Sequence, residues 1–511
     1  MQAPTPPPGG VVDFQENALT EHSGISARKS VADIVDEADA AQSGDHAMKK
    51  TLGPYSITAM GIGAIVGAGI FVLTGTAAAR YAGPAIMLSF ILGGVACAFV
   101  GLCYAELAAL IPVSGSSYTY TYATLGELFA WMIGWDLILE YAMGGATVAV
   151  GWSGYIVSVL KNLGVTLPPT FTAAPGTDVI LASGAHATAL LNLPAAAIVL
   201  VLTALLIMGT SESAKLNNVM VAVKLVVVVA FIALGAFSVH RINWTPFIPP
   251  NDGTFGHFGW SGILRGSSVV FFAFIGFDAV STAAQEAKRP QRDMPIGILG
   301  SLVICTVLYV AVAAVLTGLV PYAQLNVADP IARGVDVIGL PWFSILIKLG
   351  ALTGLTTVIL VLLYGQSRIF YTMAHDGLLP AVFARIHPRL QTPYLSQAMI
   401  GVIVAIVAAL VPIGILGEMV SIGTLFAFTL VCAAVIYLRR SERNRPRPFR
   451  VPAVPVVPIL GILFCLLLMF GLPLATWARL VIWLVLGLAV YFSYGRHHSV
   501  LRGKAHPAKV R

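Results

Sequence analysis

Long apolar runs separated by short polar segments dominate the chain from about residue 50 onward. Each run approaches or exceeds the roughly 20 residues that an α-helix needs to cross a bilayer. We therefore predict an all-α integral membrane protein with twelve transmembrane helices, near residues 54–79, 84–110, 128–160, 193–210, 216–238, 261–286, 295–318, 342–372, 396–413, 416–438, 455–472 and 477–495. An even number of spans puts both termini on the same side.

The charged residues between the runs give the orientation. If the N-terminus is inside, 22 of the 30 Lys and Arg residues lie in cytoplasmic segments, seven lie outside, and Lys224 lies within a span. This asymmetry follows the positive-inside rule. It predicts a multi-pass protein of the inner (plasma) membrane with both termini cytoplasmic.

Composition excludes a soluble protein, because 57% of the residues are hydrophobic and only 10% are charged, against about 25% charged in soluble domains. Residues 1–48 are polar and lack the apolar run of a signal peptide, so we expect a disordered cytoplasmic tail. The net charge of +7 does not indicate nucleic-acid binding, since the positive residues sit mainly at span ends. Five cysteines lie in apolar spans without a CxxC pair, which predicts no disulfide framework, no metal site and no cofactor.

The first span contains four glycines, Gly61, Gly63, Gly67 and Gly69, in the run GIGAIVGAGIF. Each glycine costs about 1 kcal/mol relative to alanine inside a helix. Close helix packing would explain two of them through the spacing Gly63-AIV-Gly67. Four favour an unwound segment, which is tolerated at membrane depth only around a cavity or inside protein.

A second irregular span, FFAFIGFDAVSTAAQEA, lies five spans later, with Gly276 and Asp278 in its middle. Because five is odd, spans one to five and six to ten would have opposite orientations. Such paired interruptions indicate the substrate site of a transporter. We predict a five-plus-five inverted repeat in residues 49–438, a basic cytoplasmic loop at 439–454, two peripheral helices at 455–495 and a basic cytoplasmic tail at 496–511.

The two interrupted spans could bind both charged ends of an amino acid through their backbone. The positive end of a half-helix that begins near Ala68 and Gly69 would hold the carboxylate. Carbonyls near Ile65 and in the aromatic segment of span six would accept the ammonium group. Phenylalanines there could gate the ligand or simply face lipid. The predicted substrate site comprises Ile65, Gly67, Ala68, Gly69, Glu140, Phe272, Ala273, Phe274 and Ile275.

Lys224 is an isolated charge inside span five, in VMVAVKLVVVVAF. It could snorkel to the cytoplasmic interface, which is about 10 Å away at 1.5 Å per residue. It could equally be a buried amine that gains and loses a proton during transport. The residues alone leave both interpretations open.

Other polar residues within spans have weaker signals. Asp136 and Glu140 share one face of span three; Asp136 could pair locally, and Glu140 could meet a substrate or form a structural hydrogen bond. Asp278 is expected to cap the inner half of span six rather than to contact substrate. The hydroxyls of Thr353, Thr356 and Thr357 could serve a cation or Lys224, although threonine commonly bonds to its own helix.

Five segments together resemble the amino acid–polyamine–organocation transporters, and most of all the bacterial relatives of the cationic amino acid transporters. These segments are GIGAIVGAGIFVLTG, WDLILEY, SAKLNNVMVAVKL, FFAFIGFDAVSTAAQEAKRPQRDMPIGI and LYGQSRIFYTMAHDGLLP. The resemblance, over about residues 50 to 495, implies a leucine-transporter-type fold, a gate at Phe272 and a proton-coupling lysine at Lys224. It also implies that Glu140 recognises longer or cationic side chains. This chain departs from the family in two ways. After span six it has KRPQRDMP where relatives often have Asn-Pro. It also has twelve predicted spans and the animal transporters have fourteen, so their substrates cannot be assigned to this chain.

We therefore expect a secondary transporter of L-amino acids that works by alternating access and is coupled to protons. An amino acid or amine exchanger without net proton flux is the alternative. A channel is disfavoured because no ring of charge or filter repeat occurs, and an enzyme because no nucleophile–base or metal constellation occurs. Expected partners are the L-amino acid, the proton and the lipid bilayer, without nucleic acid. A small accessory membrane subunit and the oligomeric state stay open.

Overall fold

The computed structural model describes residues 52–112, 116–181, 184–209, 213–390 and 392–505, together with Arg28, Lys29, Val31 and Ile34. Apart from those four residues and the last few described ones, the expected terminal tails lie outside the described residues. The described residues are mostly helical, and the sheet among them is one antiparallel hairpin, β1 (Asp178–Ile180) and β2 (His186–Thr188). The prediction of an all-α membrane protein is confirmed at this level.

Seven helical stretches of the described chain are long and apolar enough to cross a membrane. One stretch runs from the second half of the first predicted span through α5. The others contain the remaining long helices. These long helices are α5 (Ile86–Leu110), α7 (Glu127–Asn162), α9 (Ser213–Ala236), α11 (Pro290–Leu319), α13 (Pro341–His375), α15 (Ile413–Ser441) and α17 (Leu474–Val490).

Three shorter apolar helices match further predicted spans, namely α8 (Leu193–Met208), α14 (Tyr394–Leu410) and α16 (Val456–Phe470). Two predicted spans are broken into pieces. The first consists of α3 (Pro54–Ile65), η1 (Gly69–Leu73), α4 (Thr74–Ala77) and η2 (Ala78–Ala82), followed by the turn η3 (Gly83–Ala85). The sixth consists of α10 (Gly259–Val270), η6 (Phe271–Phe274) and η7 (Asp278–Glu286). The twelve-span count and the inverted repeat stay predictions.

Short helices lie in the segments that connect these elements or follow the last of them. They are α6 (Ser116–Thr124), η4 (Pro169–Phe171), η5 (Arg241–Trp244), η8 (Tyr322–Gln324), α12 (Pro330–Ile338), η9 (Ala381–Ala384), η10 (Tyr491–Gly495), α18 (Arg496–His498) and α19 (Val500–Ala505).

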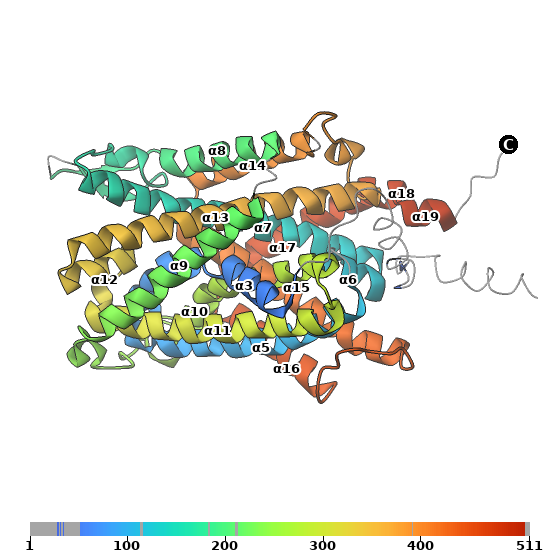
Figure 1. The fold of residues 1–511 in the computed structure, drawn as a ribbon, viewed down its shortest axis with the longest axis horizontal. Helices are drawn as coiled ribbons and strands as arrows, with labels where there is room; N and C mark the ends of the chain where they lie inside the picture. The colour runs from blue at the N-terminus through green and yellow to red at the C-terminus, as the bar shows by residue number, and fades with distance from the viewer. Residues whose placement is uncertain are drawn as a thin grey trace, which may run out of the picture.

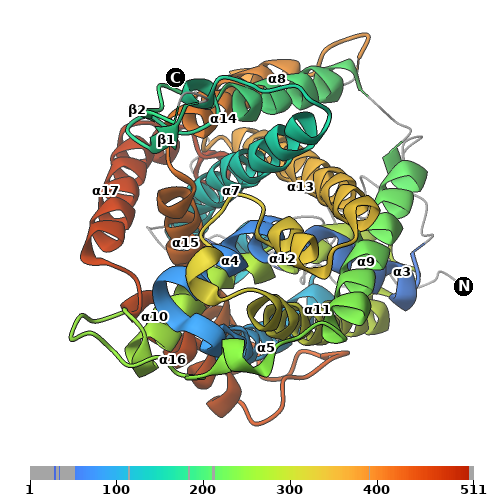
Figure 2. The same cartoon turned by 90° about the vertical axis from the view of Figure 1, so that its left-hand side faces the viewer.

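The long helices run along the long axis of the molecule, and α9 crosses them diagonally (Figure 1). Helix α7 packs against α13 and α15, while α11 packs against α5 and α3. We call the end that carries α6, α18 and α19 the basic face, after Arg496 and Arg502 in its last two helices. The opposite end carries α12 and the β-hairpin (Figure 2). α4, a piece of the first broken span, lies near the middle of the same view, between α15 and α12 (Figure 2).

The last helices of the chain are fastened to the basic face by a buried carboxylate at the start of α7. Glu127 is fully buried and accepts hydrogen bonds from Arg502 Nε and Tyr491 Oη, both at 2.8 Å, and from the Ser499 hydroxyl. Tyr122 of α6 donates to the same carboxylate at 3.2 Å. Thus α6, α7 and the chain end form one polar cluster. A buried carboxylate is tolerated when it is paired and hydrogen-bonded in this way.

Candidate functional site

The first predicted span is interrupted at its glycines. Helix α3 ends at Ile65, and Val66 is extended with φ −73° and ψ 98°. The chain then turns back into a helix, where the Gly67 carbonyl accepts from the N–H groups of Ile70 and Phe71, both at 3.2 Å. The first N–H groups of a helix have no partner within it. Those of Ala68 and Gly69 are therefore the donors presented at this break.

The sixth predicted span is interrupted next to the first. Ile275 is extended after η6, with φ −61° and ψ 138°, and Gly276 follows with φ 113°. Side chains other than glycine's are strained at such a φ value. A Cβ atom on Gly276 would also lie 2.9 Å from the Ala64 carbonyl oxygen of α3. Glycine is thus needed here for both the turn and the approach of the two spans.

The two breaks touch at Gly69. A Cβ atom on this residue would lie 2.2 Å from Cα and 2.3 Å from Cβ of Ala273. Gly61 and Gly63 are packed differently, since their Cβ atoms would meet Ser301 and Val221 side-chain atoms at 2.6 Å. Gly61 and Gly63 therefore serve close packing against α11 and α9. Gly69 brings the breaks of span one and span six into direct contact.

A small cavity lies between the two breaks, α7 and α13. The breaks contribute Ile65, Gly67, Ala68, Gly69, Phe272, Ile275, Gly276 and Asp278, while α7 contributes Glu140, Tyr141, Gly144 and Val148, and α13 contributes Val358, Val361 and Leu362. Its free volume of about 30 Å³ holds about two water molecules. An amino acid can therefore enter only if the lining side chains move apart.

Lys224 binds the break of span one from α9. Its side chain is fully buried, and its amine donates to the Val66 carbonyl at 3.0 Å and to the Gly63 carbonyl. Both carbonyls belong to the end of α3, where helical partners are missing. The snorkelling interpretation is therefore wrong, because the amine points into the protein and not to an interface.

A profile of the family described as "Amino acid permease" matches residues 52–491. The chain belongs to the amino acid permease family. It is 48% identical over 478 residues to the branched-chain amino acid permease BcaP of Bacillus subtilis, an alignment that covers 93% of this chain and 99% of BcaP. It is 46% identical to the methylthioribose transporter of the same organism, with 90% of this chain and 96% of that protein covered. A vacuolar cationic amino acid transporter 4 of Arabidopsis thaliana is 40% identical, over 78% of this chain and 64% of the relative.

The predicted site residues of this permease do not all reach the cavity. Ile65, Gly67, Ala68, Gly69, Glu140, Phe272 and Ile275 line it. Ala273 packs against Gly69, and Phe274 packs against Phe90 and Tyr309, with ring centroids 6.3 and 5.5 Å away. These two residues lie outside the lining. Their expected contribution to ligand contact is accordingly revised to packing around the break.

The carbonyls expected to receive an ammonium group are partly engaged by the permease itself. The Tyr309 hydroxyl of α11 lies 2.8 Å from the carbonyl oxygens of both Ile65 and Ala273. One hydroxyl hydrogen can serve only one of them at a time. The Phe272 carbonyl accepts from the Ile275 N–H at 3.2 Å. Nothing in the run LYVAVAA around Tyr309 indicates this role, because the run resembles ordinary lipid-facing residues.

The acidic residues of the permease match expectation only in part. Asp278 Oδ1 accepts from the Gly276 N–H at 3.2 Å, on the side of the break, and its capping of the inner helix η7 stays a prediction. Both carboxylate oxygens of Asp136 are buried and have no hydrogen-bond partner among the described residues, so its expected local pairing is wrong. Glu140 Oε2 is likewise unpartnered within the described chain, and Glu140 lines the cavity. Of the pair on α7, only Glu140 is placed to meet a ligand.

The three threonines of α13 bond to their own helix. Thr353, Thr356 and Thr357 donate to carbonyls of Gly350, Leu352 and Gly354 at 2.7 to 2.9 Å. None of these bonds involves Lys224, whose stem instead passes Gly354. Among the described residues there is also no cluster of His, Cys, Asp and Glu that could hold a metal ion. The polar groups of the site are thus backbone groups, the Lys224 amine, the carboxylates of Glu140 and Asp278, and the hydroxyls of Tyr141 and Tyr309.

Proposed function

We propose that this permease carries L-amino acids into the cell by proton-coupled symport, with alternating access around the cavity between the two breaks. Two features support this proposal together. The helix that resumes after the first break presents the N–H groups of Ala68 and Gly69 to the same cavity that Ile65 and Phe272 line. Helix N-termini bind carboxylates, and unwound carbonyls suit an ammonium group.

The observation that carries the coupling to protons is the position of Lys224. Its amine is buried and bound to carbonyls of the break that lines the cavity. A protonated amine has three donors, and a neutral one has fewer and no charge. Loss of the proton would therefore weaken the bonds that hold the end of α3. The proton and the ligand would then both bind at the break of span one, which couples their binding.

We propose an aliphatic amino acid as the preferred substrate. Val148, Ile275, Val358, Val361 and Leu362 form an apolar wall beside the backbone donors. Relatives with closely similar sequences are named as a branched-chain amino acid permease and a methylthioribose transporter. Glu140 on the same lining is the feature that would favour a cationic side chain instead.

The orientation that we propose places the basic face in the cytoplasm and the protein in the plasma membrane. Lys288, Arg289, Arg439 and Arg447 belong to segments that the positive-inside rule assigns to the cytoplasm. A reporter protein fused to the C-terminus would be shielded from protease in sealed right-side-out vesicles. Digestion of the reporter in intact vesicles would reverse this orientation.

The test of the function is uptake of labelled L-leucine by the purified permease in sealed proteoliposomes with an alkaline interior. We expect saturable uptake above equilibrium that a protonophore abolishes. L-valine and L-isoleucine should compete strongly, D-leucine weakly, and L-lysine and methylthioribose less than L-valine. Flux that requires internal amino acid would establish an exchanger, and strongest competition by L-lysine or methylthioribose would replace the proposed substrate class.

A further inference from the structure

A groove on an exposed side of α11 lies outside the cavity described above. It has a volume of about 690 Å³ and runs along the first half of α11, with Pro448 and Phe449 of the 439–454 loop as its second wall. Its apolar lining includes Pro295, Ile296, Leu299, Val303 and Ile304. Arg292 and Gln291 line the end of the groove at the basic face.

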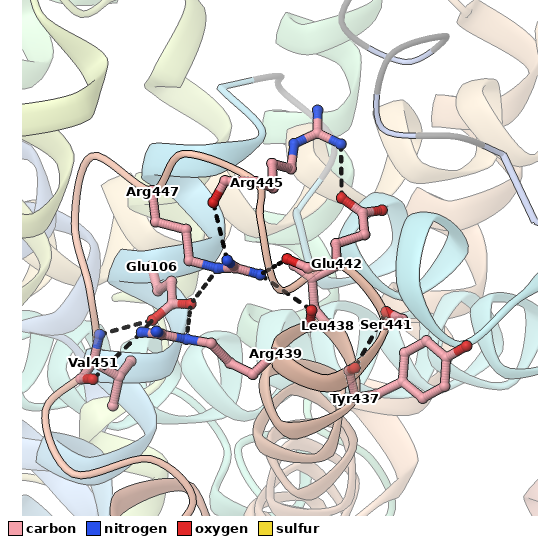
Figure 3. Close-up of polar contacts among 9 residues, drawn as sticks. All are labelled: Glu106, Tyr437, Leu438, Arg439, Ser441, Glu442, Arg445, Arg447 and Val451. Carbon is pink, nitrogen blue, oxygen red and sulfur yellow. Dashed lines mark hydrogen bonds and ion pairs between the residues drawn. The ribbon is translucent and has the colours of Figure 1, made fainter.

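The wall that the loop provides is held by a buried ion cluster at the inner end of α5. Glu106 is 1% exposed and receives two hydrogen bonds from Arg439, at 2.8 and 2.7 Å, and one from the Val451 N–H at 2.7 Å. Arg447 approaches the same carboxylate at 3.3 Å and donates to the Leu438 and Glu442 carbonyls (Figure 3). The loop on both sides of Pro448 and Phe449 is therefore held against the helices, and these contacts fix the position of the second wall of the groove.

The mouth of the groove carries positive charge. Arg292 is exposed on one wall, Arg450 is exposed beside Phe449, and Lys288 and Arg289 are exposed just before α11. The cluster behind the loop adds to this, because two arginines share the single carboxylate of Glu106. Burial, together with the neighbouring Arg439, lowers the pKa of Arg447, while Glu106 opposes the shift. An anionic group is the complementary partner for this end.

The length of the groove matches one leaflet of a bilayer. From Arg292 to Ile304 the helix rises about 18 Å at 1.5 Å per residue, and half of the hydrocarbon core is about 15 Å thick. Beyond it, every residue from Tyr309 to Leu319 is buried or half-buried. A transmembrane helix would need a free face across the whole bilayer, whereas an acyl chain needs only this half.

We propose that this groove binds a phospholipid of the cytoplasmic leaflet, with its acyl chain along α11 and its anionic headgroup at Arg292 and the neighbouring basic residues. The orientation is the one proposed above, and the binding does not depend on the transported substrate. Anionic lipids are concentrated in the cytoplasmic leaflet, where each nearby Lys or Arg favours them.

The test uses delipidated full-length permease in detergent, titrated with phosphatidylglycerol or with phosphatidylcholine of the same acyl chains and followed by native mass spectrometry. We expect one phosphatidylglycerol to be retained in preference to phosphatidylcholine. Arg292→Gln should weaken phosphatidylglycerol about fivefold, equivalent to about 1 kcal/mol for one basic residue, and leave phosphatidylcholine unchanged. Arg385→Gln, an exposed arginine away from the groove, should change neither.

A second pair of variants tests the acyl-chain part of the groove. Val303 lines it and Val307 does not, although both valines lie on α11 and are 63% exposed. Val303→Trp should remove retention of the lipid, and Val307→Trp should keep it. Equal behaviour of the two variants would overturn the proposal, as would equal retention of both lipids by the wild type. If glycerol phosphate displaces the lipid, the groove binds the anionic group and not the acyl chain, which would contradict the proposal. If Val303→Trp loses a dimer that the wild type forms, a second permease molecule occupies the groove instead of a lipid.

Discussion

The two breaks that meet at the cavity are stabilised in different ways. In span six, the backbone N–H groups after the break bond locally: the Ile275 N–H donates to the Phe272 carbonyl, and the Gly276 N–H donates to Asp278 two residues later. The Tyr309 hydroxyl, which lies 2.8 Å from the Ala273 carbonyl, is the remote partner that span six shares with span one. In span one, the partners come from far along the chain. Lys224 and Tyr309, which are 158 and 244 residues away from the carbonyls of Val66 and Ile65, bind the end of α3.

This difference indicates separate roles for the two breaks. A conformation held by a glycine with positive φ and by local hydrogen bonds depends mainly on the residues of the segment itself. Span six is therefore expected to keep its conformation. A conformation held by a remote amine and a remote hydroxyl changes when either partner moves or loses a proton. Span one is therefore expected to be the responsive half of the site.

The largest effect is expected where the two breaks touch. Gly69→Val would push a side chain into the backbone of Ala273, which lies 2.2 Å from the position of Cβ. Overpacking against backbone should cost about 3 kcal/mol or more, so little folded protein is expected in detergent by size-exclusion chromatography. A folded but inactive variant is not expected.

Gly414→Val is the matched control, because no atom lies within 4 Å of its Cβ position in the first turn of α15. It should elute as the wild type does and transport normally. A folded Gly69→Val protein would show that the two breaks can separate, and the close approach would then be a property of one state only.

The second largest effect tests whether the break of span one depends on its remote partner Lys224. Lys224→Met keeps much of the buried stem but leaves the Gly63 and Val66 carbonyls without their donor. Each buried group left unpaired costs about 1–3 kcal/mol, so uptake driven by a pH gradient should fall about tenfold or more in proteoliposomes. The remaining flux should no longer vary with external pH.

Lys348→Met serves as its control, since Lys348 is also buried, at 4% exposure, but binds neither break. Its uptake should retain the pH profile of the wild type. A wild-type profile in Lys224→Met would remove the proton-coupling role from Lys224 and leave it a purely structural one.

The smallest effect concerns the hydroxyl that joins the breaks. Tyr309→Phe removes one hydrogen bond, worth about 1 kcal/mol, and should shift the KM of uptake about fivefold while the maximal rate changes less. Tyr155→Phe is a close comparison, because the Tyr155 hydroxyl donates at 2.8 Å to the Phe71 carbonyl of span one only. Equal KM shifts in the two variants would show that the contact of Tyr309 with both spans has no effect beyond that of one hydrogen bond to span one.

The sequence predicted those features that depend on local backbone. The glycines around Gly67 and the pair Gly276 and Asp278 indicated two interruptions, and the structure has both. Roles that depend on distant contacts could not be predicted in this way. Nothing near Tyr309 in the chain signals its two carbonyl partners, and Lys224 had two open interpretations until its amine was seen on α3.

The same reason separates the residues that were placed well from those that were not. Glu140, which was predicted at the site, lines the cavity, whereas Asp136 lacks the local partner considered for it among the described residues. The exclusion of Ala273 follows from its contact with Gly69, 204 residues earlier by number, which no local pattern encodes.

The buried carboxylate at the start of α7 bears on how the chain is made. Glu127 is synthesised long before its partners Tyr491, Ser499 and Arg502, which follow 364 to 375 residues later. At 5 to 20 residues per second, the ribosome needs about 20 to 75 s to reach them. During that interval Glu127 lacks these three partners, so the nascent α6–α7 region completes its inner end only when translation is almost over.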